Sequence, residues 1–154
     1  MTRPLGEMRL VAEIAAEPER IWAVIRRFGQ VADWNPVARS SRLVAGVDAV
    51  PGAERELQIA DGGSVRERLT GLDDAALRLD YEMLSFPIPV TAQRNRITVA
   101  PGTVAGRSLV TFSAHFMPKA GSPAEDVAAL NRAAFAGAAV GIGRLLDVEV
   151  RVPV

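Results

Sequence analysis

Apolar and polar residues alternate through most of the first 120 residues, which is the pattern of strands with one buried face. An early segment departs from this pattern, because Ile21, Trp22 and Ile25 recur at helical spacing. Pro18 suits the first turn of that helix and Gly29 ends it. The pattern predicts strands at residues 8–16, 38–46, 53–60, 64–72, 76–84, 92–101 and 107–118.

Two further helices follow from the pattern. A short one is expected at residues 30–36, where Pro36 stops it. A long one closes the chain at residues 121–150, with Ser122 as N-cap and Glu125 completing a capping box. The order is one strand, two short helices, about six strands and one long helix, which predicts an α+β class with an antiparallel sheet. The terminal helix is the only element large enough to cover that sheet.

Composition narrows the classes of function. The chain has 154 residues, the size of a single domain, and its 18 basic residues balance 18 acidic ones. That balance disfavours nucleic acid and anionic membranes as partners. The absence of cysteine and the single histidine exclude disulfides and the common metal sites, so no metal and no cofactor is expected. The N-terminus does not have the pattern of a signal peptide and no long apolar run exists, so a cytoplasmic protein is expected.

Three stretches resemble one known family. They are "IAAEPERIWAVIRRFGQVADWNP", "PGAERELQI…GGSVRERLTGLDDAALRLDYEM" and "ITVAPG…VTFSAHF". Together they are similar to the polyketide cyclase/dehydratase branch of the START-like, or SRPBCC, superfamily over residues 8–148. The resemblance implies one domain over residues 1–154 with a helix-grip fold, in which a curved seven-stranded sheet wraps the C-terminal helix. It also implies a deep, mainly apolar cavity between sheet and helix that binds hydrophobic small molecules.

Strand alternation assigns candidate residues to that cavity. Val65 and Leu69 point inward, and Glu67 shares their face, as Arg55 shares the face of Leu57. A hairpin centred on Gly62 places Arg55 near Leu69 and diagonal to Glu67, within reach of an ion pair. The pair is either a structural bridge near the mouth of the cavity or a part of the site.

Gln93 and Asn95 pose a puzzle, because alternation turns both amides to the apolar face of their strand. The family pattern has an aromatic residue at the first position and a small one at the second, so both depart from it. Two amides in a pocket would orient a bound carbonyl or hydroxyl group. The alternative is a bulge that shifts the register, or amides that cap backbone groups at the strand end.

The remaining candidates also have two interpretations each. Tyr81 either contacts the ligand or only packs in the core. Trp34 either forms part of the gate of the cavity or acts as a hydrophobic plug for the short helix before it. On the terminal helix, helical spacing predicts an inward stripe of Val127, Leu130, Ala134, Ala138, Gly141 and Leu145, with Asn131, Phe135 and Ile142 on one flank. Three glycines in "AGAAVGIG" make room for a ligand, for the sheet or for a partner subunit. His115 lies on the outer face of its strand. The other expected ligand-binding residues are Asn35, Leu79, Met83, Asn131, Phe135 and Ala138.

Two functions follow. The first is a cofactor-independent cyclase or dehydratase acting on a hydrophobic, oxygenated substrate, with Glu67 as the proton-transfer group and Tyr81 and Arg55 stabilising an enolate. An ion pair with Arg55 would make the Glu67 carboxylate less able to accept a proton. The second is a non-catalytic carrier or sensor of a lipid, quinone or secondary metabolite, which needs only the cavity and its gate. The oligomeric state stays open, a homodimer included.

Overall fold

A computed structural model describes residues 5–153. The first four residues, part of the segment assessed above for a signal peptide, and Val154 lie outside this range. The order of elements confirms the α+β class. The elements are β1 (Gly6–Ile14), α1 (Pro18–Ile25), the 3-10 helix η1 (Phe28–Asp33), β2 (Ala38–Ala45), β3 (Glu54–Ile59), β4 (Ser64–Asp73), β5 (Arg78–Met83), β6 (Val90–Pro101), β7 (Ser108–Pro118), α2 (Ala124–Leu146) and β8 (Val150–Arg151).

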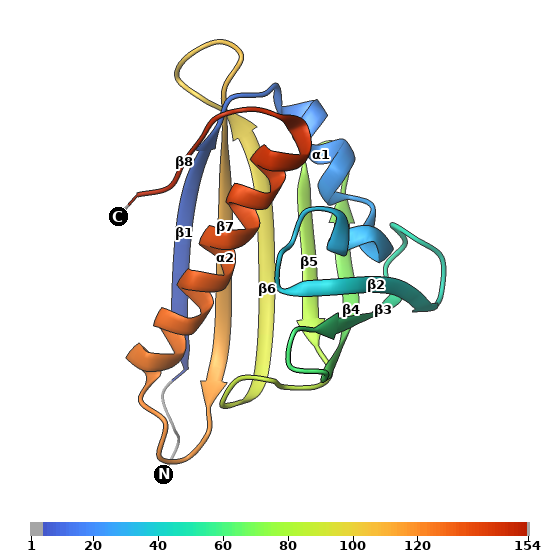
Figure 1. The fold of residues 1–154 in the computed structure, drawn as a ribbon, viewed down its shortest axis with the longest axis vertical. Helices are drawn as coiled ribbons and strands as arrows, with labels where there is room; N and C mark the ends of the chain where they lie inside the picture. Colours follow the sequence, from blue (N-terminus) through green and yellow to red (C-terminus); the bar gives the residue numbers. More distant parts are fainter. Residues whose placement is uncertain (1–4, 154) are drawn as a thin grey trace.

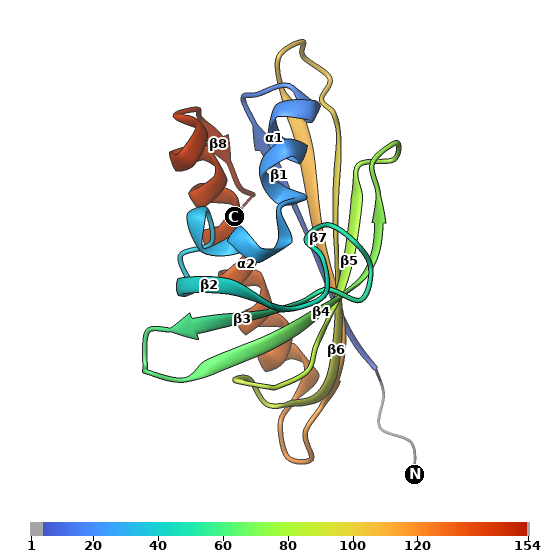
Figure 2. The same ribbon diagram turned by 90° about the vertical axis from the view of Figure 1, so that its right-hand side faces the viewer.

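One antiparallel sheet holds all the strands, in the order β2-β3-β4-β5-β6-β7-β1-β8. Helix α2 runs diagonally across one face of it, over β1 and β7 (Figure 1). In the view turned by 90° the strands β2, β3 and β4 curve towards the side that carries α2 (Figure 2). The helix-grip arrangement is therefore confirmed.

Alternation along the strands places the core where the sequence predicts it. On β7 the residues Val110, Phe112, Ala114 and Phe116 are buried, and His115 between them is exposed. The same period buries every second residue of β1. A strand with one buried face has no other way to hide its apolar side chains.

Helix α1 anchors on the sheet through one acidic residue. Trp22 is buried, and its Nε1–H donates to Asp74 Oδ1 over 2.8 Å. Arg26 donates to the same carboxylate. A hydrogen bond from Arg26, followed by the one from Trp22, lowers the pKa of Asp74. Helix α1 thus attaches to the β4–β5 connection, and Phe28, fully buried, opens η1.

The C-terminus differs from the predicted helix at both ends. Helix α2 begins at Ala124 with Pro123 as the N-cap residue, and no side chain caps it, so the predicted capping box is wrong. It ends at Leu146, because Asp147 adopts a left-handed conformation with φ of 56°. The chain then reverses, and Val150 and Arg151 pair with β1 as a short eighth strand. The sheet therefore has one strand more than expected.

The glycines of α2 serve close packing within the chain. A Cβ on Gly141 would overlap the carbonyl oxygen of Trp34, and one on Gly143 would overlap the side chain of Val150. Gly137 has only Pro36 nearby, at an ordinary contact distance of 3.5 Å. Room for a ligand is the wrong explanation for Gly141 and Gly143, because the backbone after η1 and the side chain of Val150 in β8 occupy the space.

The buried stripe of α2 is also rotated from the predicted one. Leu130 and Leu145, expected to face the sheet, are about half exposed. The buried side chains that make up the stripe are Val127, Asn131, Phe135, Ala138, Ala139 and Ile142. Phe135 stacks on Phe112 of the sheet with ring centroids 5.3 Å apart. Asn131 thereby moves from the flank of the predicted stripe to its centre.

Candidate functional site

A cavity of about 120 Å³ lies between the curved strands and α2. Strands β3 to β6 supply one wall and the helix supplies another, together with the segment after η1 and the β5–β6 connection. Most of the wall is apolar. Its lining residues are Asn35, Val37, Arg55, Leu57, Val65, Glu67, Tyr81, Met83, Pro87, Ile88, Gln93, Asn95, Leu130, Asn131, Ala134 and Phe135.

Nine of the predicted site residues belong to this lining and three do not. Trp34, Leu79 and Ala138 are buried in the core outside it. Trp34 packs with its carbonyl against Gly141, and its Nε1–H is the one buried side-chain donor or acceptor without a partner within residues 5–153. Asn35 accepts a hydrogen bond from the amide of Val37 at the rim.

Strand register brings the polar residues together. Arg55 lies directly opposite Glu67 on β3 and β4, and Tyr81 of β5 lies between Leu69 and Asn95 of its neighbours. The predicted diagonal register is wrong by one residue on each strand, because the turn is centred on Asp61 and Gly62 follows it with φ of 89°. The closer register strengthens the predicted ion pair.

Arg55 and Glu67 form a buried ion pair. Arg55 Nε and Nη2 donate to Glu67 Oε1 over 2.9 and 2.8 Å. Arg55 Nη1 donates to the carbonyl oxygen of Phe28 over 3.0 Å, and the guanidinium lies 3.9 Å from the centroid of the Phe28 ring. The three guanidinium nitrogens are thus engaged, and the predicted pairing is confirmed.

Tyr81 stands beside this pair with its ring 4.8 Å from the guanidinium carbon of Arg55. Burial raises the pKa of Tyr81 far above its ordinary value, and the negative charge of Glu67 adds to the rise. The positive charge of Arg55 and donors on Asn95 and Arg55 near the hydroxyl oppose it. The phenol therefore keeps its proton at neutral pH and is available as a hydrogen-bond donor.

The two inward amides of β6 find their partner on α2. Gln93 Nε2 donates to Asn131 Oδ1 over 2.7 Å and to Asn95 Oδ1 over 3.0 Å. Asn131 Nδ2 donates back to Gln93 Oε1 and to the carbonyl oxygen of Val127. All three amides are at least 94% buried. They bridge sheet and helix. Strand β6 does have an irregular register between Val90 and Ala92, but from Gln93 onward alternation is regular, and both amides share the buried face of Ile97.

This amide bridge predicts a stability cost on truncation. Asn131→Ala is expected to lower the free energy of unfolding by about 1–3 kcal/mol, because Gln93 loses its partner while buried. Urea denaturation measures the change. In the double variant Gln93→Leu/Asn131→Leu both polar groups are gone, and most of the loss should be recovered. Equal losses in the two variants would contradict the bridge.

Several lining residues lie in segments without a regular pattern. Val37 follows the turn after η1, and Pro87 and Ile88 belong to the proline-rich connection between β5 and β6. Neither segment has the alternation that assigned faces elsewhere. Their apolar character was the only available signal. They form the rim of the cavity opposite Leu130 and Ala134 of α2.

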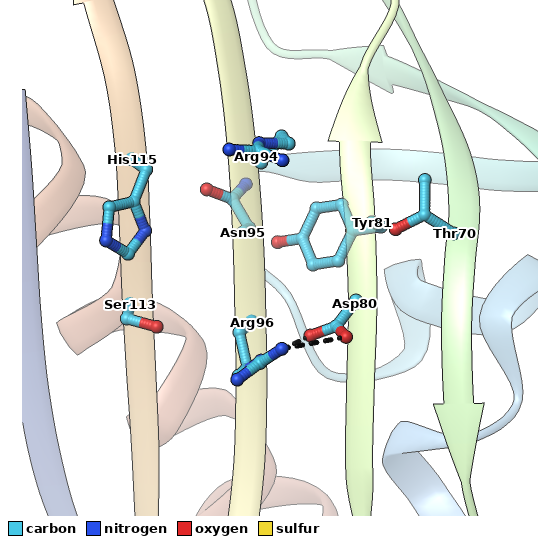
Figure 3. Close-up of a pocket in the computed structure, with 8 residues that line it drawn as sticks. All are labelled: Thr70, Asp80, Tyr81, Arg94, Asn95, Arg96, Ser113 and His115. Atoms are coloured by element: carbon cyan, nitrogen blue, oxygen red, sulfur yellow. Dashed lines mark hydrogen bonds and ion pairs between the residues drawn. The ribbon is translucent and has the colours of Figure 1, made fainter. Parts of the chain in front are cut away.

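A larger hollow of about 330 Å³ lies on the outer face of the sheet (Figure 3). Its wall is charged, and Arg96 donates to Asp80 over 2.6 Å. His115, expected on the outer face, borders it and is exposed, with Glu7 3.9 Å away. In Figure 3 the hydroxyl of Tyr81 points towards β6, which carries Asn95. The outer hollow is lined by charged side chains and the inner cavity mainly by apolar ones, so the inner cavity is the better small-molecule site.

The structure offers no cation site and no membrane span in the part of the chain that it describes. Within residues 5–153 no three His, Cys, Asp or Glu side chains gather as metal ligands. Over the same residues no helix has the length and hydropathy to cross a bilayer. The polar side chains that line the buried part of the cavity are those of the Arg55–Glu67 pair, Tyr81 and the three amides.

Comparisons with known proteins identify the family. The chain is similar to an uncharacterized protein from Bacillus thuringiensis, with 30% identity, a TM-score of 0.80, and coverage of 88% of this chain and 95% of that one. It is similar to the protein XoxI from Bacillus cereus, with 30% identity, a TM-score of 0.78, and coverage of 96% and 97%. A third structure, from Thermobifida fusca, has 27% identity, a TM-score of 0.74, and coverage of 90% and 94%.

No curated protein matches the chain. A family model described as polyketide cyclase/dehydrase and lipid transport matches residues 6–145, nearly the whole of the described structure. The match spans the sheet from β1 onward and almost all of α2, the elements that enclose the cavity. The chain therefore belongs to the polyketide cyclase/dehydrase and lipid transport family of the SRPBCC type.

Proposed function

We propose that this protein binds a hydrophobic, oxygenated small molecule in the cavity between β3–β6 and α2. One observation carries the proposal: a mainly apolar, largely buried wall converges on a few polar side chains. Apolar surface supplies the affinity of such sites and the polar groups orient the ligand. The family description, which includes lipid transport, supports the same function.

The size of the cavity favours a compact ligand. Its volume of about 120 Å³ is below the roughly 300–1,000 Å³ of sites for drug-sized molecules. An engineered apolar cavity of about 150 Å³ in another protein takes up benzene. A ligand with one six-membered ring fits this volume, and a longer molecule would extend past the rim formed by Val37, Ile88 and Leu130.

The geometry favours a carrier or sensor over an enzyme. Glu67 is the candidate base, but its Oε1 already accepts two hydrogen bonds from Arg55. Arg55 in turn is committed to Glu67 and to the carbonyl of Phe28, and has no nitrogen left without a partner to stabilise an enolate. Proton transfer would require that this buried pair first separate, which carries a large electrostatic cost.

Cyclase or dehydratase activity remains the second candidate, and the family description favours it. Tyr81, protonated and buried at the cavity wall, is a donor that could stabilise a developing oxyanion. Glu67→Gln separates the two functions. A carrier or sensor without chemistry shows no turnover in either form, whereas an enzyme with Glu67 as base loses turnover and keeps its affinity for substrate.

Ligand binding is tested by blocking the cavity. Native mass spectrometry of the purified protein is expected to show a co-purifying small molecule, which Ala134→Phe removes by filling the space beside Phe135. Ala133→Phe is the matched control, because Ala133 is exposed next along the same helix. A bound molecule that survives Ala134→Phe, or is lost equally in Ala133→Phe, would place the ligand elsewhere.

A further inference from the structure

The carboxylate of Glu67 has one oxygen that the fold does not use. Oε1 accepts both hydrogen bonds from Arg55, and the structure gives Oε2 no partner among residues 5–153. Trp34 Nε1 is the one fully buried side-chain nitrogen or oxygen without a hydrogen-bond partner in that range. Since Oε2 also has no partner but is not among the fully buried atoms, it has accessible surface. Glu67 lines the cavity, so Oε2 is an acceptor that opens onto it.

A donor faces the same space. Tyr81 also lines the cavity, and the groups that reach its hydroxyl oxygen, on Asn95 and Arg55, are donors, so its own proton is left for another acceptor. Glu67 influences Tyr81 through its charge and not through a hydrogen bond. Tyr81 and Glu67 lie on neighbouring strands two pairs apart in register, with Leu69 opposite Tyr81 and Met83 opposite Glu67. The cavity wall therefore has a donor and an acceptor that do not satisfy each other.

The other buried polar side chains of the wall already have partners. The Gln93–Asn131 pair is reciprocal, and Asn95 Oδ1 accepts from Gln93. The guanidinium of Arg55 carries a charge that Glu67 neutralises at 2.8 Å. An anionic ligand group would meet no uncompensated positive charge here and would lie beside a carboxylate, which disfavours it.

We propose that the cavity selects an uncharged ligand that carries a hydroxyl group, which accepts a hydrogen bond from Tyr81 and donates one to Glu67 Oε2. This inference rests on the proposed function and adds the chemical class to it. A hydroxyl is the smallest group that both accepts and donates. A ligand without it leaves two buried polar groups unpaired, whereas a carboxylate adds repulsion from Glu67.

Three ring compounds of similar size test the selection: phenol, toluene and benzoate. Amide chemical-shift titration locates each in the protein and measures its affinity. Phenol is expected to shift the cavity amides and to bind at least about tenfold more tightly than toluene or benzoate, since one buried hydrogen bond left unmade corresponds to roughly that factor. Toluene matches phenol in shape, so the comparison isolates the hydroxyl.

Variants assign the preference to the two side chains. Glu67→Gln and, independently, Tyr81→Phe are expected to reduce the preference for phenol over toluene to about threefold or less. Two variants are used so that a failure of one to fold leaves the other informative. Arg94→Gln is the matched control, since Arg94 precedes Asn95 on β6 but is exposed on the outer face, and it should keep the full preference.

The outcomes distinguish selection for a hydroxyl group from ligand binding in the cavity, the proposed function on which it rests. Equal binding of toluene and phenol in the cavity, tighter binding of benzoate, or a preference that persists in both Glu67→Gln and Tyr81→Phe would overturn the hydroxyl selection and leave cavity binding intact. If neither phenol nor toluene shifts the cavity amides, the proposed function fails together with the inference. The inference is supported if phenol binds more tightly than toluene and benzoate and if both Glu67→Gln and Tyr81→Phe abolish this preference.

Discussion

Replacing Arg55 with methionine is expected to lower the free energy of unfolding by about 3–5 kcal/mol. The substitution leaves the Glu67 carboxylate at least nine-tenths buried without its counter-charge. It also removes the hydrogen bond to the carbonyl of Phe28 and the guanidinium from above the Phe28 ring. Urea denaturation followed by tryptophan fluorescence measures the loss.

Two variants show whether the buried charge is the cause. Arg55→Met/Glu67→Leu removes both charges and should recover most of the stability, because apolar residues of similar volume replace a buried pair at little cost. Arg42→Met breaks an exposed ion pair with Glu56 and should cost no more than about 1 kcal/mol. Similar losses for Arg55→Met and Arg42→Met would show that Glu67 is not effectively buried.

The second large effect concerns two glycines on one helix. Gly141→Ala is expected to destabilise the protein by about 1–3 kcal/mol, because the new Cβ overlaps the backbone carbonyl of Trp34 and forces the helix away from it. This cost exceeds the gain of about 1 kcal/mol that alanine brings to a helix interior. Thermal unfolding monitored by circular dichroism checks the sign.

Gly137→Ala is the matched control four residues earlier. The nearest atom to its added Cβ is Pro36 Cγ at 3.5 Å, an ordinary contact, so only the helix propensity changes. It should stabilise the protein by about 0.5–1 kcal/mol. Opposite signs for the two substitutions would confirm that close packing of α2 on the segment after η1 sets the requirement for Gly141. A stabilising Gly141→Ala would contradict it.

The two predictions bear on the same property of the cavity, its rigidity. The Arg55–Glu67 pair holds the polar end in place, and the contact between Gly141 and Trp34 holds α2 against the segment that leads to Asn35 and Val37 at the rim. A preformed site loses less conformational entropy when it binds its ligand. Loss of either contact should therefore weaken ligand binding as well as stability.

Much of the fold could be read from the chain because alternation is a local property. One apolar residue in a strand assigns the face of every second neighbour, so the inward positions of Glu67, Tyr81, Gln93 and Asn95 followed without a structure. The same rule placed His115 outside. The helix-grip arrangement followed from the order of elements and from the resemblance, because a single antiparallel sheet needs one large cover.

The contacts between these elements could not be predicted from the sequence, because they depend on distances that no local pattern encodes. The partner of Gln93 is Asn131, 38 residues away on a helix whose buried stripe is rotated from the one its own periodicity predicted. Gly141 and Gly143 are required by close contact with Trp34 and Val150, which belong to segments brought near α2 only by folding. A turn shifted by one residue set Arg55 opposite Glu67. Periodicity decides which side chains face inward, and packing in three dimensions decides which of them meet and how much space they leave.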